Sequence, residues 1–182
     1  MIQVSGLNKS LYGGGHRVDI LNGIDLVIPT GQFVAITGAS GSGKTTLLSL
    51  IAGLDESTHG KIIIDNQDIT KLSEDELAEL RGQHFGFIFQ SFNLIPTLTA
   101  LENVVLAAEL NGTDRSQKKS TDLLNIVGLA ERNHHYPAQL SGGEQQRLCL
   151  ARAFINEPDF VLADEPTGNL DSQNSKRVLD LM

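Results

Sequence analysis

A short glycine-rich stretch limits the possible folds of this chain more than any other feature. It reads G-A-S-G-S-G-K-T over residues 38–45, between an apolar run at 33–37 and the helical pattern T-T-L-L-S-L-I-A-G-L. A nearly all-apolar run is typical of a strand that is buried on both faces. A glycine-rich loop between such a strand and a helix is the setting of a phosphate-binding P-loop. The alternative is an ordinary glycine-rich turn before a helix, and the intact pattern disfavours it.

The residue types in this loop suit a nucleotide with a bound magnesium ion. Glycines allow backbone N–H groups to turn inward around phosphate oxygens, and the start of the following helix adds unpaired donors and a positive dipole end. Lys44 would place a positive charge near the β- and γ-phosphates, while the hydroxyl of Thr45 can bind Mg²⁺. The loop therefore predicts a nucleoside triphosphate together with Mg²⁺.

Strand and helix patterns alternate along most of the chain. Further strands are expected at 61–65, 85–89 and 160–163. Ser73 and Glu76 have the Ser-x-x-Glu spacing of a capping box, which marks the start of a helix between the first two of these strands. Alternation of this kind predicts a parallel α/β sheet.

Two parts of the chain differ from this alternation. Residues 19–28 carry strand-forming residues, with a turn signal at Asn22-Gly23. Residues 99–129 show no strand pattern and read as helix, loop and helix, with polar breaks at Asn111-Gly112 and near Ser120. We interpret this second region as part of a helical lobe that is inserted into the α/β fold.

Two adjacent acidic residues follow the apolar run at 160–163. Asp164 and Glu165 would lie at the carboxyl end of a buried strand, which is the edge where ligands bind in open α/β sheets. Neighbouring carboxylates repel each other unless a cation lies near, and this favours Asp164 as a ligand of Mg²⁺. Glu165 could act as the general base that polarises the attacking water. A turn or helix cap at Asp-Glu-Pro is the alternative, and the P-loop in the same chain favours catalysis.

Two further residues have positions that suit contact with a nucleotide. Gln90 ends the strand pattern F-G-F-I-F, where a neutral amide could contact Mg²⁺ or the attacking water. Tyr12 lies in the glycine-rich turn Y-G-G-G-H, where its ring could stack on adenine. On the residues alone, a loop glutamine and an ordinary surface tyrosine stay open as alternatives.

A second glycine pair indicates another phosphate contact. The stretch L-S-G-G-E-Q-Q-R at 140–147 has capping-box spacing between Ser141 and Glu144, so Ser141 could simply begin a helix. Gly142 and Gly143 are poor helix formers and would leave the N–H groups of the first turn accessible to an anion. One nucleotide can meet this helix start and the P-loop if two chains face each other head to tail. The motif therefore predicts a homodimer with an isologous interface.

Composition limits the other classes of function. With 182 residues, of which 40% are hydrophobic, the chain is long enough for one domain with its own core. Its net charge of −8 argues against general nucleic-acid binding. Cys149 is the only cysteine, which suits a reducing compartment, and its apolar neighbours in sequence indicate a small buried side chain. No apolar run approaches the ~20 residues of a membrane span, and no secretory signal is present, so contact with a membrane would require a partner.

At this point the chain resembles the ATP-binding cassette (ABC) ATPases over essentially its whole length. The motifs that carry the resemblance are G-A-S-G-S-G-K-T-T, F-I-F-Q, L-S-G-G-E-Q-Q-R, F-V-L-A-D-E-P and N-L-D, and L-S-G-G-E-Q-Q-R is the most specific of them. The longer stretches H-F-G-F-I-F-Q-S-F-N-L-I-P-T-L-T-A-L-E-N-V and A-D-E-P-T-G-N-L-D resemble the ATP-binding subunits of the macrolide-exporter and lipoprotein-release group. Within that group, the chain is similar to the subunit that pairs with a large membrane permease of unknown cargo.

The resemblance implies a P-loop NTPase fold, with a RecA-like parallel core sheet, an N-terminal antiparallel β part and an inserted helical subdomain. The nucleotide-binding core would comprise residues 1–90 and 157–182, and the helical signature subdomain residues of about 91–156. The implied activity is ATP hydrolysis with Mg²⁺. A head-to-tail homodimer would power export or mechanotransmission through an integral-membrane permease, at the cytoplasmic face of the cell membrane.

The resemblance also implies a role for each motif residue. Glu165, Gln90 and Lys44 would be catalytic, whereas Thr45, Gln90 and Asp164 would bind Mg²⁺. Tyr12 would be the aromatic ring that stacks on adenine, and Asp171 the loop acid that couples the two sites. The phosphate loop would consist of Gly38, Ala39, Ser40, Gly41, Ser42, Gly43, Lys44, Thr45 and Thr46. The signature motif of the opposite subunit would contribute Ser141, Gly142 and Gly143.

The chain departs from the family pattern near its C-terminus. ABC ATPases carry a switch histidine well beyond the catalytic glutamate, and no histidine of this sequence follows Glu165. We therefore interpret residues 1–182 as an ABC ATPase domain that is incomplete at the C-terminus, and we expect weak or no turnover from them. Two other functions stay open: a soluble ABC ATPase that acts on nucleic acid or ribosomes, and a nucleotide-binding module without turnover.

Overall fold

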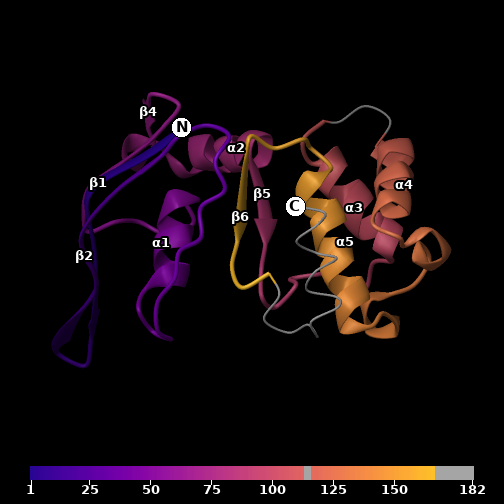
Figure 1. Ribbon diagram of the computed structural model, residues 1–182, viewed down its shortest axis with the longest axis horizontal. Coiled ribbons are helices and arrows are strands. Elements are labelled where there is room, and N and C mark those ends of the chain that lie inside the picture. The colour runs from indigo at the N-terminus through magenta and orange to yellow at the C-terminus, as the bar shows by residue number, and fades with distance from the viewer. Residues whose placement is uncertain (113–115, 167–182) are drawn as a thin grey trace. The chain divides into compact units, whose positions relative to one another are not determined.

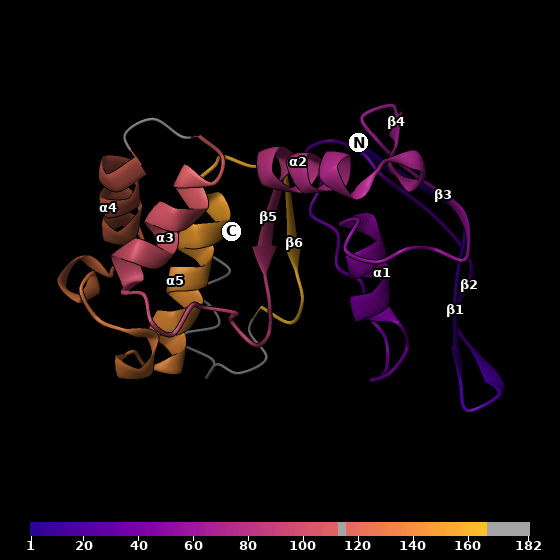
Figure 2. The same cartoon turned by 180° about the vertical axis from the view of Figure 1, so that it is seen from behind.

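The computed structural model describes residues 1–112 and 116–166 of the chain. Figures 1 and 2 show its ribbon from opposite sides. The contacts within the chain form two compact units, Met1–Arg81 and Gly82–Met182. The first unit contains an antiparallel sheet and the second a parallel strand pair, so the α/β fold with an antiparallel part that the family resemblance implied is confirmed. The strand predicted at 61–65 as part of a parallel sheet belongs instead to the antiparallel sheet, because its ladder partner is the N-terminal strand.

An antiparallel sheet forms the base of the first unit. Alternate residues of its strands face the core, since Ile2, Val4, Ile62 and Ile64 are all buried. In spatial order β2-β1-β3-β4, the strands are β1 (Ile2–Gly13), β2 (His16–Ile28), β3 (His59–Ile64) and β4 (Gln67–Asp68). This sheet is the N-terminal antiparallel part that the family resemblance implied.

A tight hairpin joins β1 and β2. Gly14 and Gly15 link the strands with φ angles of 57° and 79°, and a two-residue turn with positive φ at both positions favours glycine. The prediction of a second turn at Asn22-Gly23 is wrong, because β2 continues through both residues. Gly23, with φ of 65°, lies at an irregularity in the β1–β2 register, and its N–H donates to Oδ1 of Asn8 at 3.0 Å. The turn signal therefore marks a bulge.

Helix α1 (Lys44–Ile51) follows the phosphate loop as predicted, and the side chains that it buries are Leu47, Leu50 and Ile51. The apolar run at 33–37 does not form the predicted strand, because it has no β-ladder within the described residues. The expected burial on both faces is also wrong, since Phe33 is 77% exposed and Val34 is 42% exposed. An apolar run provides neither the ladder partner nor the covering layers that a buried strand requires.

Helix α2 (Glu74–His84) follows a single 3₁₀ turn at Ile69–Lys71. Its predicted capping box is confirmed. Oε2 of Glu76 accepts the N–H of Ser73 at 2.8 Å, and Oγ of Ser73 accepts the N–H of Glu76 at 3.4 Å. Ser73 and Glu76 therefore mark the start of this helix, as their spacing predicted.

The second unit contains the parallel strands β5 (Phe85–Ile88) and β6 (Phe160–Ala163), which lie side by side in Figures 1 and 2. Both were predicted from their apolar runs. Their register places Phe85 opposite Phe160 and Ile88 opposite Ala163. The two strands therefore end at the same edge, which fixes where the residues after each strand lie.

Three helices fill the interval between these strands and gather into a bundle in both views. They are α3 (Ala100–Glu109), α4 (Ser116–Ile126) and α5 (Gly142–Phe154), with 3₁₀ turns at Ala130–Arg132 and Pro137–Gln139. A shared apolar core holds them together through residues that include Val104, Leu124 and Leu148. The predicted break near Ser120 is wrong, because Ser120 lies inside α4 and is fully buried.

Candidate functional site

Glycines shape the phosphate loop of the first unit. Gly41 and Gly43 have φ angles of 77° and 88°, in the left-handed region that favours glycine. A β-carbon on Gly43 would lie 2.8 Å from the side chain of Leu21 and 3.1 Å from the carbonyl oxygen of Ile20, both on β2. Glycine is therefore required here for the backbone conformation and for the close approach of β2.

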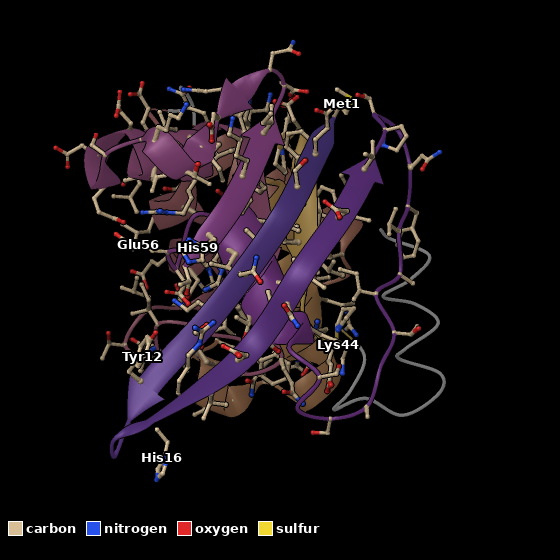
Figure 3. The ribbon with its side chains drawn as sticks, turned by 90° about the vertical axis from the view of Figure 1, so that its left-hand side faces the viewer. Met1, Tyr12, His16, Lys44, Glu56 and His59 are labelled. Atoms are coloured by element: carbon tan, nitrogen blue, oxygen red, sulfur yellow. The ribbon has the colours of Figure 1, made fainter. Side chains whose placement is uncertain are left out.

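The start of α1 is arranged to accept an anion. Gly43 is the N-cap residue, no side chain caps the helix, and its first turn contains no acidic residue. The N–H groups and the positive dipole end are therefore directed at whatever lies in front of the helix. Nζ of Lys44 donates to the carbonyl oxygens of Gly38 at 2.9 Å and Ala39 at 3.0 Å, which holds the ammonium group over the loop. Figure 3 labels Lys44 at this position.

Tyr12 lies near the tip of the β1–β2 hairpin, as Figure 3 shows. It is 75% exposed and pairs across the hairpin with Arg17. The guanidinium of Arg17 interacts chiefly with Asp19, which raises its pKa, and Tyr12 adds to that effect. An exposed ring can receive a flat heterocycle on its face, so the contact with adenine stays a prediction.

The carboxyl ends of β5 and β6 bring three of the predicted residues together. The N–H of Asp164 donates to the carbonyl oxygen of Ile88 at 2.9 Å, which continues the ladder by one residue. Beyond the strands, Nε2 of Gln90 donates to Oε2 of Glu165 at 2.9 Å. Both side chains are exposed, and Asp164 is partly buried. Gln90, Asp164 and Glu165 thus all lie at one edge of the strand pair.

The backbone at Glu165 is held in an uncommon conformation, with φ of 47°. Side-chain-bearing residues adopt this region rarely, and those that do are concentrated at functional sites. A carboxylate has two oxygens, so Glu165 can accept the amide of Gln90 and still take a proton from water. The arrangement is suited to an oriented general base.

The second glycine pair begins α5. Ser141 is the N-cap, and its capping box with Glu144 is complete. Oε2 of Glu144 accepts the Ser141 N–H at 2.8 Å and its hydroxyl at 2.9 Å, while Oγ of Ser141 accepts the Glu144 N–H at 3.4 Å. These bonds from the Ser141 backbone and hydroxyl lower the pKa of Glu144. A β-carbon on Gly142 would meet no atom within 4 Å, whereas Gly143 is buried. The helix start is therefore both capped and open on its outer side.

The two units divide the predicted site residues between them. Tyr12 and the loop at 38–46 belong to the first unit, whereas Gln90, the Asp164-Glu165 pair and the motif at 140–147 belong to the second. Asp171 lies outside the described residues.

One contact of the Gln90 segment was missed by the sequence reasoning. Arg152 on α5 donates to the backbone carbonyls of Phe92 and Asn93, shortly after Gln90. The available signal was a single basic residue within the otherwise apolar run L-C-L-A-R-A-F, which suggests a specific partner for the charge.

Comparison with known proteins assigns the family. The family model described as "ABC transporter" matches residues 21–168, which include the predicted phosphate loop at 38–45, the motif at 140–147 and the acidic pair Asp164-Glu165. The chain belongs to the ABC transporter family. The resemblance seen in the motifs is thus confirmed, and the chain is an ATP-binding cassette of the P-loop NTPase fold.

Relatives of this cassette are similar along its whole length. The chain is 48% identical to "Uncharacterized ABC transporter ATP-binding protein YbbA" of Escherichia coli K12, with all of this chain and 81% of that protein covered. It is also 48% identical to "Macrolide export ATP-binding/permease protein MacB" of Brucella abortus, where all of this chain matches 28% of a longer protein. The name of the second relative agrees with the macrolide-exporter group that the motifs indicated.

Two solved structures share the fold closely. A dimeric structure of the ABC transporter cassette MJ0796 has a TM-score of 0.93 and 41% identity, and it covers all of this chain and 81% of that chain. A dimeric post-hydrolysis state of the same cassette, bound to ADP and Pi, has a TM-score of 0.93 and 40% identity, with the same coverage. These similarities support the transporter ATPase over the alternative that acts on nucleic acid. No helix in the described part of the cassette is long and apolar enough to cross a membrane.

Proposed function

We propose that this cassette works as a head-to-tail homodimer that binds and hydrolyses ATP at two composite sites and thereby drives a membrane permease. The observation that carries this proposal is the presence of two anion-binding helix starts in one chain, at Lys44 and at Ser141. The MJ0796 cassette is described as dimeric, and MacB as an ATP-binding/permease protein, which supports the same assembly here. The permease would hold the cassette at the cytoplasmic face of the cell membrane.

The nucleotide contacts follow from the two helix starts. The loop at 38–46 would bind the phosphates of ATP through its N–H groups and Lys44, and Tyr12 would stack on the adenine. Ser141 and the adjoining glycines of the opposite protomer would contact the γ-phosphate. Each nucleotide would then lie between two protomers, so ATP binding itself favours the dimer.

Mg²⁺ fits the proposed site because oxygen donors are available for it. Within the described ranges, no three His, Cys, Asp or Glu side chains gather in a way that could hold a metal ion by themselves. Mg²⁺ is commonly held by one or two carboxylates together with substrate phosphates and water, so such a cluster is not required. Thr45, Asp164 and Gln90 would supply the protein oxygens. When bound, the ion neutralises charge that develops on the phosphate oxygens.

Glu165 and Gln90 would perform the hydrolytic step. Glu165 takes the proton from the attacking water, and Gln90 holds the carboxylate in place through the bond observed at 2.9 Å. Lys44 stabilises the negative charge on the transferred phosphoryl group. Positioning and charge stabilisation are the main contributions that a protein makes to phosphoryl transfer, and these residues supply both.

A complementation experiment tests the head-to-tail arrangement. Lys44→Met disables the loop of one protomer, and Gly142→Asp places a negative charge at the start of α5 in the other. Each variant alone forms only damaged sites, so we expect negligible ATPase activity. A mixture of the two forms heterodimers with one intact composite site, so turnover should return.

The matched control mixes Lys44→Met with the double variant Lys44→Met/Gly142→Asp, which creates no intact site in any pairing. This mixture should stay inactive. If the first mixture also stays inactive under conditions where the wild-type protein forms dimers with ATP, the head-to-tail proposal is wrong.

A further inference from the structure

The turn that contains Gln90 ends in two neighbouring residues in the left-handed region. Phe92 has φ of 60° and Asn93 has φ of 49°. The N–H of Phe92 donates to the carbonyl oxygen of Phe89 at 3.0 Å, and this bond closes a turn within which Gln90 lies. Left-handed conformations are unfavourable for residues with a β-carbon. Other contacts must therefore hold this turn in place.

Arg152 supplies those contacts from α5. Its Nη2 donates to the carbonyl oxygen of Phe92 at 2.7 Å, and its Nη1 donates to the carbonyl oxygen of Asn93. Sγ of Cys149, one turn earlier on the same helix, donates to the same Phe92 oxygen at 3.2 Å. A guanidinium group is a rigid fork of donors, so one side chain can fix two neighbouring carbonyl groups at once. Arg152 thus bonds to the two strained residues themselves.

The helix that carries Arg152 is firmly packed on β5, the strand that leads to Gln90. Ile88 of β5 forms a buried cluster with Leu150 and Ala153 of α5. A β-carbon on Gly86 would lie 2.5 Å from the carbonyl oxygen of Ala153, so helix and strand are in close contact there. Arg152 therefore acts from a fixed support, and the position of its guanidinium group relative to the Gln90 turn is well defined.

We propose that Arg152 is a positioning residue for ATP hydrolysis: it holds the turn at Phe92-Asn93 so that the amide of Gln90 meets the carboxylate of Glu165. This inference rests on the proposed roles of Gln90 and Glu165. Arg152 does not touch the reacting atoms. Its effect on turnover passes through the orientation of Gln90, and the same helix begins at Ser141, so one rigid element serves both parts of the proposed site.

Replacement of Arg152 tests the positioning role. In the full-length protein, we expect Arg152→Met to lower kcat about tenfold or more while the KM for ATP changes less than about twofold, because small displacements of a catalytic group are costly. Arg152→Lys keeps one donor and should recover part of the loss. The control is Lys119→Met, which removes a positive charge from an exposed ion pair with Glu157 on the same unit. That variant should retain wild-type kcat.

A double-mutant cycle separates positioning from general structural support. If Arg152 acts through Gln90, then Arg152→Met should have almost no further effect on kcat in a chain that already carries Gln90→Ala. If the two losses multiply, Arg152 acts independently of Gln90 and the inference is wrong. If Gln90→Ala alone leaves kcat unchanged, the proposed role of Gln90 fails instead. Denaturant unfolding of the four proteins of the cycle, and of Arg152→Lys, identifies any variant that has lost its fold.

Discussion

The amide of Gln90 donates a hydrogen bond to the carboxylate of Glu165, with 2.9 Å between Nε2 and Oε2. The two residues come from different strands of the same parallel pair, and each follows the carboxyl end of its strand. A general base is effective when its orientation is fixed before the substrate arrives. The parallel pairing of β5 and β6 therefore brings Gln90 to Glu165, where its amide can orient the proposed general base.

Removal of the amide tests this link. We expect Gln90→Ala to lower kcat by roughly tenfold to a hundredfold, because Glu165 loses its orienting partner. The affinity for ATP, measured by equilibrium titration, should change little. Gln83→Ala is the control, since Gln83 is also an exposed glutamine of the second unit. Equal kcat values for the two variants would contradict the role of Gln90.

The charge at the start of α5 can be changed without disturbing the fold. A β-carbon on Gly142 meets no atom within 4 Å, and the residue has ordinary backbone angles for a helix start. Gly142→Asp should therefore fold normally, and its carboxylate is even favourable near a helix N-terminus. The same charge repels a γ-phosphate, so ATP-dependent dimerisation and hydrolysis should be lost.

Gly142→Ala is the matched neutral variant. It adds a methyl group to open space and improves helix propensity. We expect it to keep most of the ATP-dependent dimer, as measured by light scattering. Equal behaviour of the two variants would show that phosphate charge is not sensed at this helix.

Ser120 carries a buried hydroxyl that has no hydrogen-bond partner among residues 1–112 and 116–166. It lies inside α4 with no exposed surface. Ser120→Ala removes the unsatisfied group and replaces it with a better helix former, so we expect the free energy of unfolding to rise by about 1 kcal/mol. Ser116→Ala is the control, because that hydroxyl bonds to Glu109 at 3.4 Å. Urea unfolding compares them, and a destabilised Ser120→Ala would contradict the prediction.

Three capping boxes make the stability of the helices depend on pH. The carboxylates of Glu76, Glu102 and Glu144 each accept bonds from the backbone and hydroxyl of the N-cap residue, and these bonds hold the pKa of each glutamate below its ordinary value of 4.5. A depressed folded-state pKa means that the stabilisation is fully present above pH 4.5. It is lost as the pH falls through the lower folded-state values.

Replacement of the three glutamates by glutamine checks this dependence. Denaturant unfolding between pH 7 and pH 3 should show a shallower loss of stability in the triple variant than in the wild-type protein, because the variant has fewer carboxylates to protonate. Parallel curves for the two proteins would show that the capping carboxylates do not titrate with depressed pKa values.

Features encoded by a few adjacent residues were predictable from the sequence. Ser73 and Ser141 begin helices because each is followed three residues later by a glutamate that completes a capping box. The apolar run at 160–163 forms β6 and delivers Asp164 to the carboxyl end of the parallel pair. Such signals are local, so they do not depend on how the rest of the chain packs.

Features decided by distant contacts were not predictable. Phe33 belongs to an apolar run that predicted a buried strand, yet no ladder forms there among the described residues. Ser120 looked like a break, but packing inside the helical bundle keeps it within α4. The bond from Arg152 to Phe92 joins residues 60 positions apart, and the local sequence around Arg152 does not encode which residue is its partner. Tertiary context overrides propensity at each of these places.

The most direct test of the account is the behaviour of Glu165→Gln in the full-length protein with ATP and Mg²⁺. Glutamine keeps the size of the side chain but cannot take a proton from water. We predict that this variant binds ATP, accumulates as a stable dimer in light scattering, and hydrolyses ATP at less than about one hundredth of the wild-type rate. Rapid turnover would contradict the role of Glu165 as general base, and a protein that stays monomeric with saturating ATP would contradict the ATP-bound dimer.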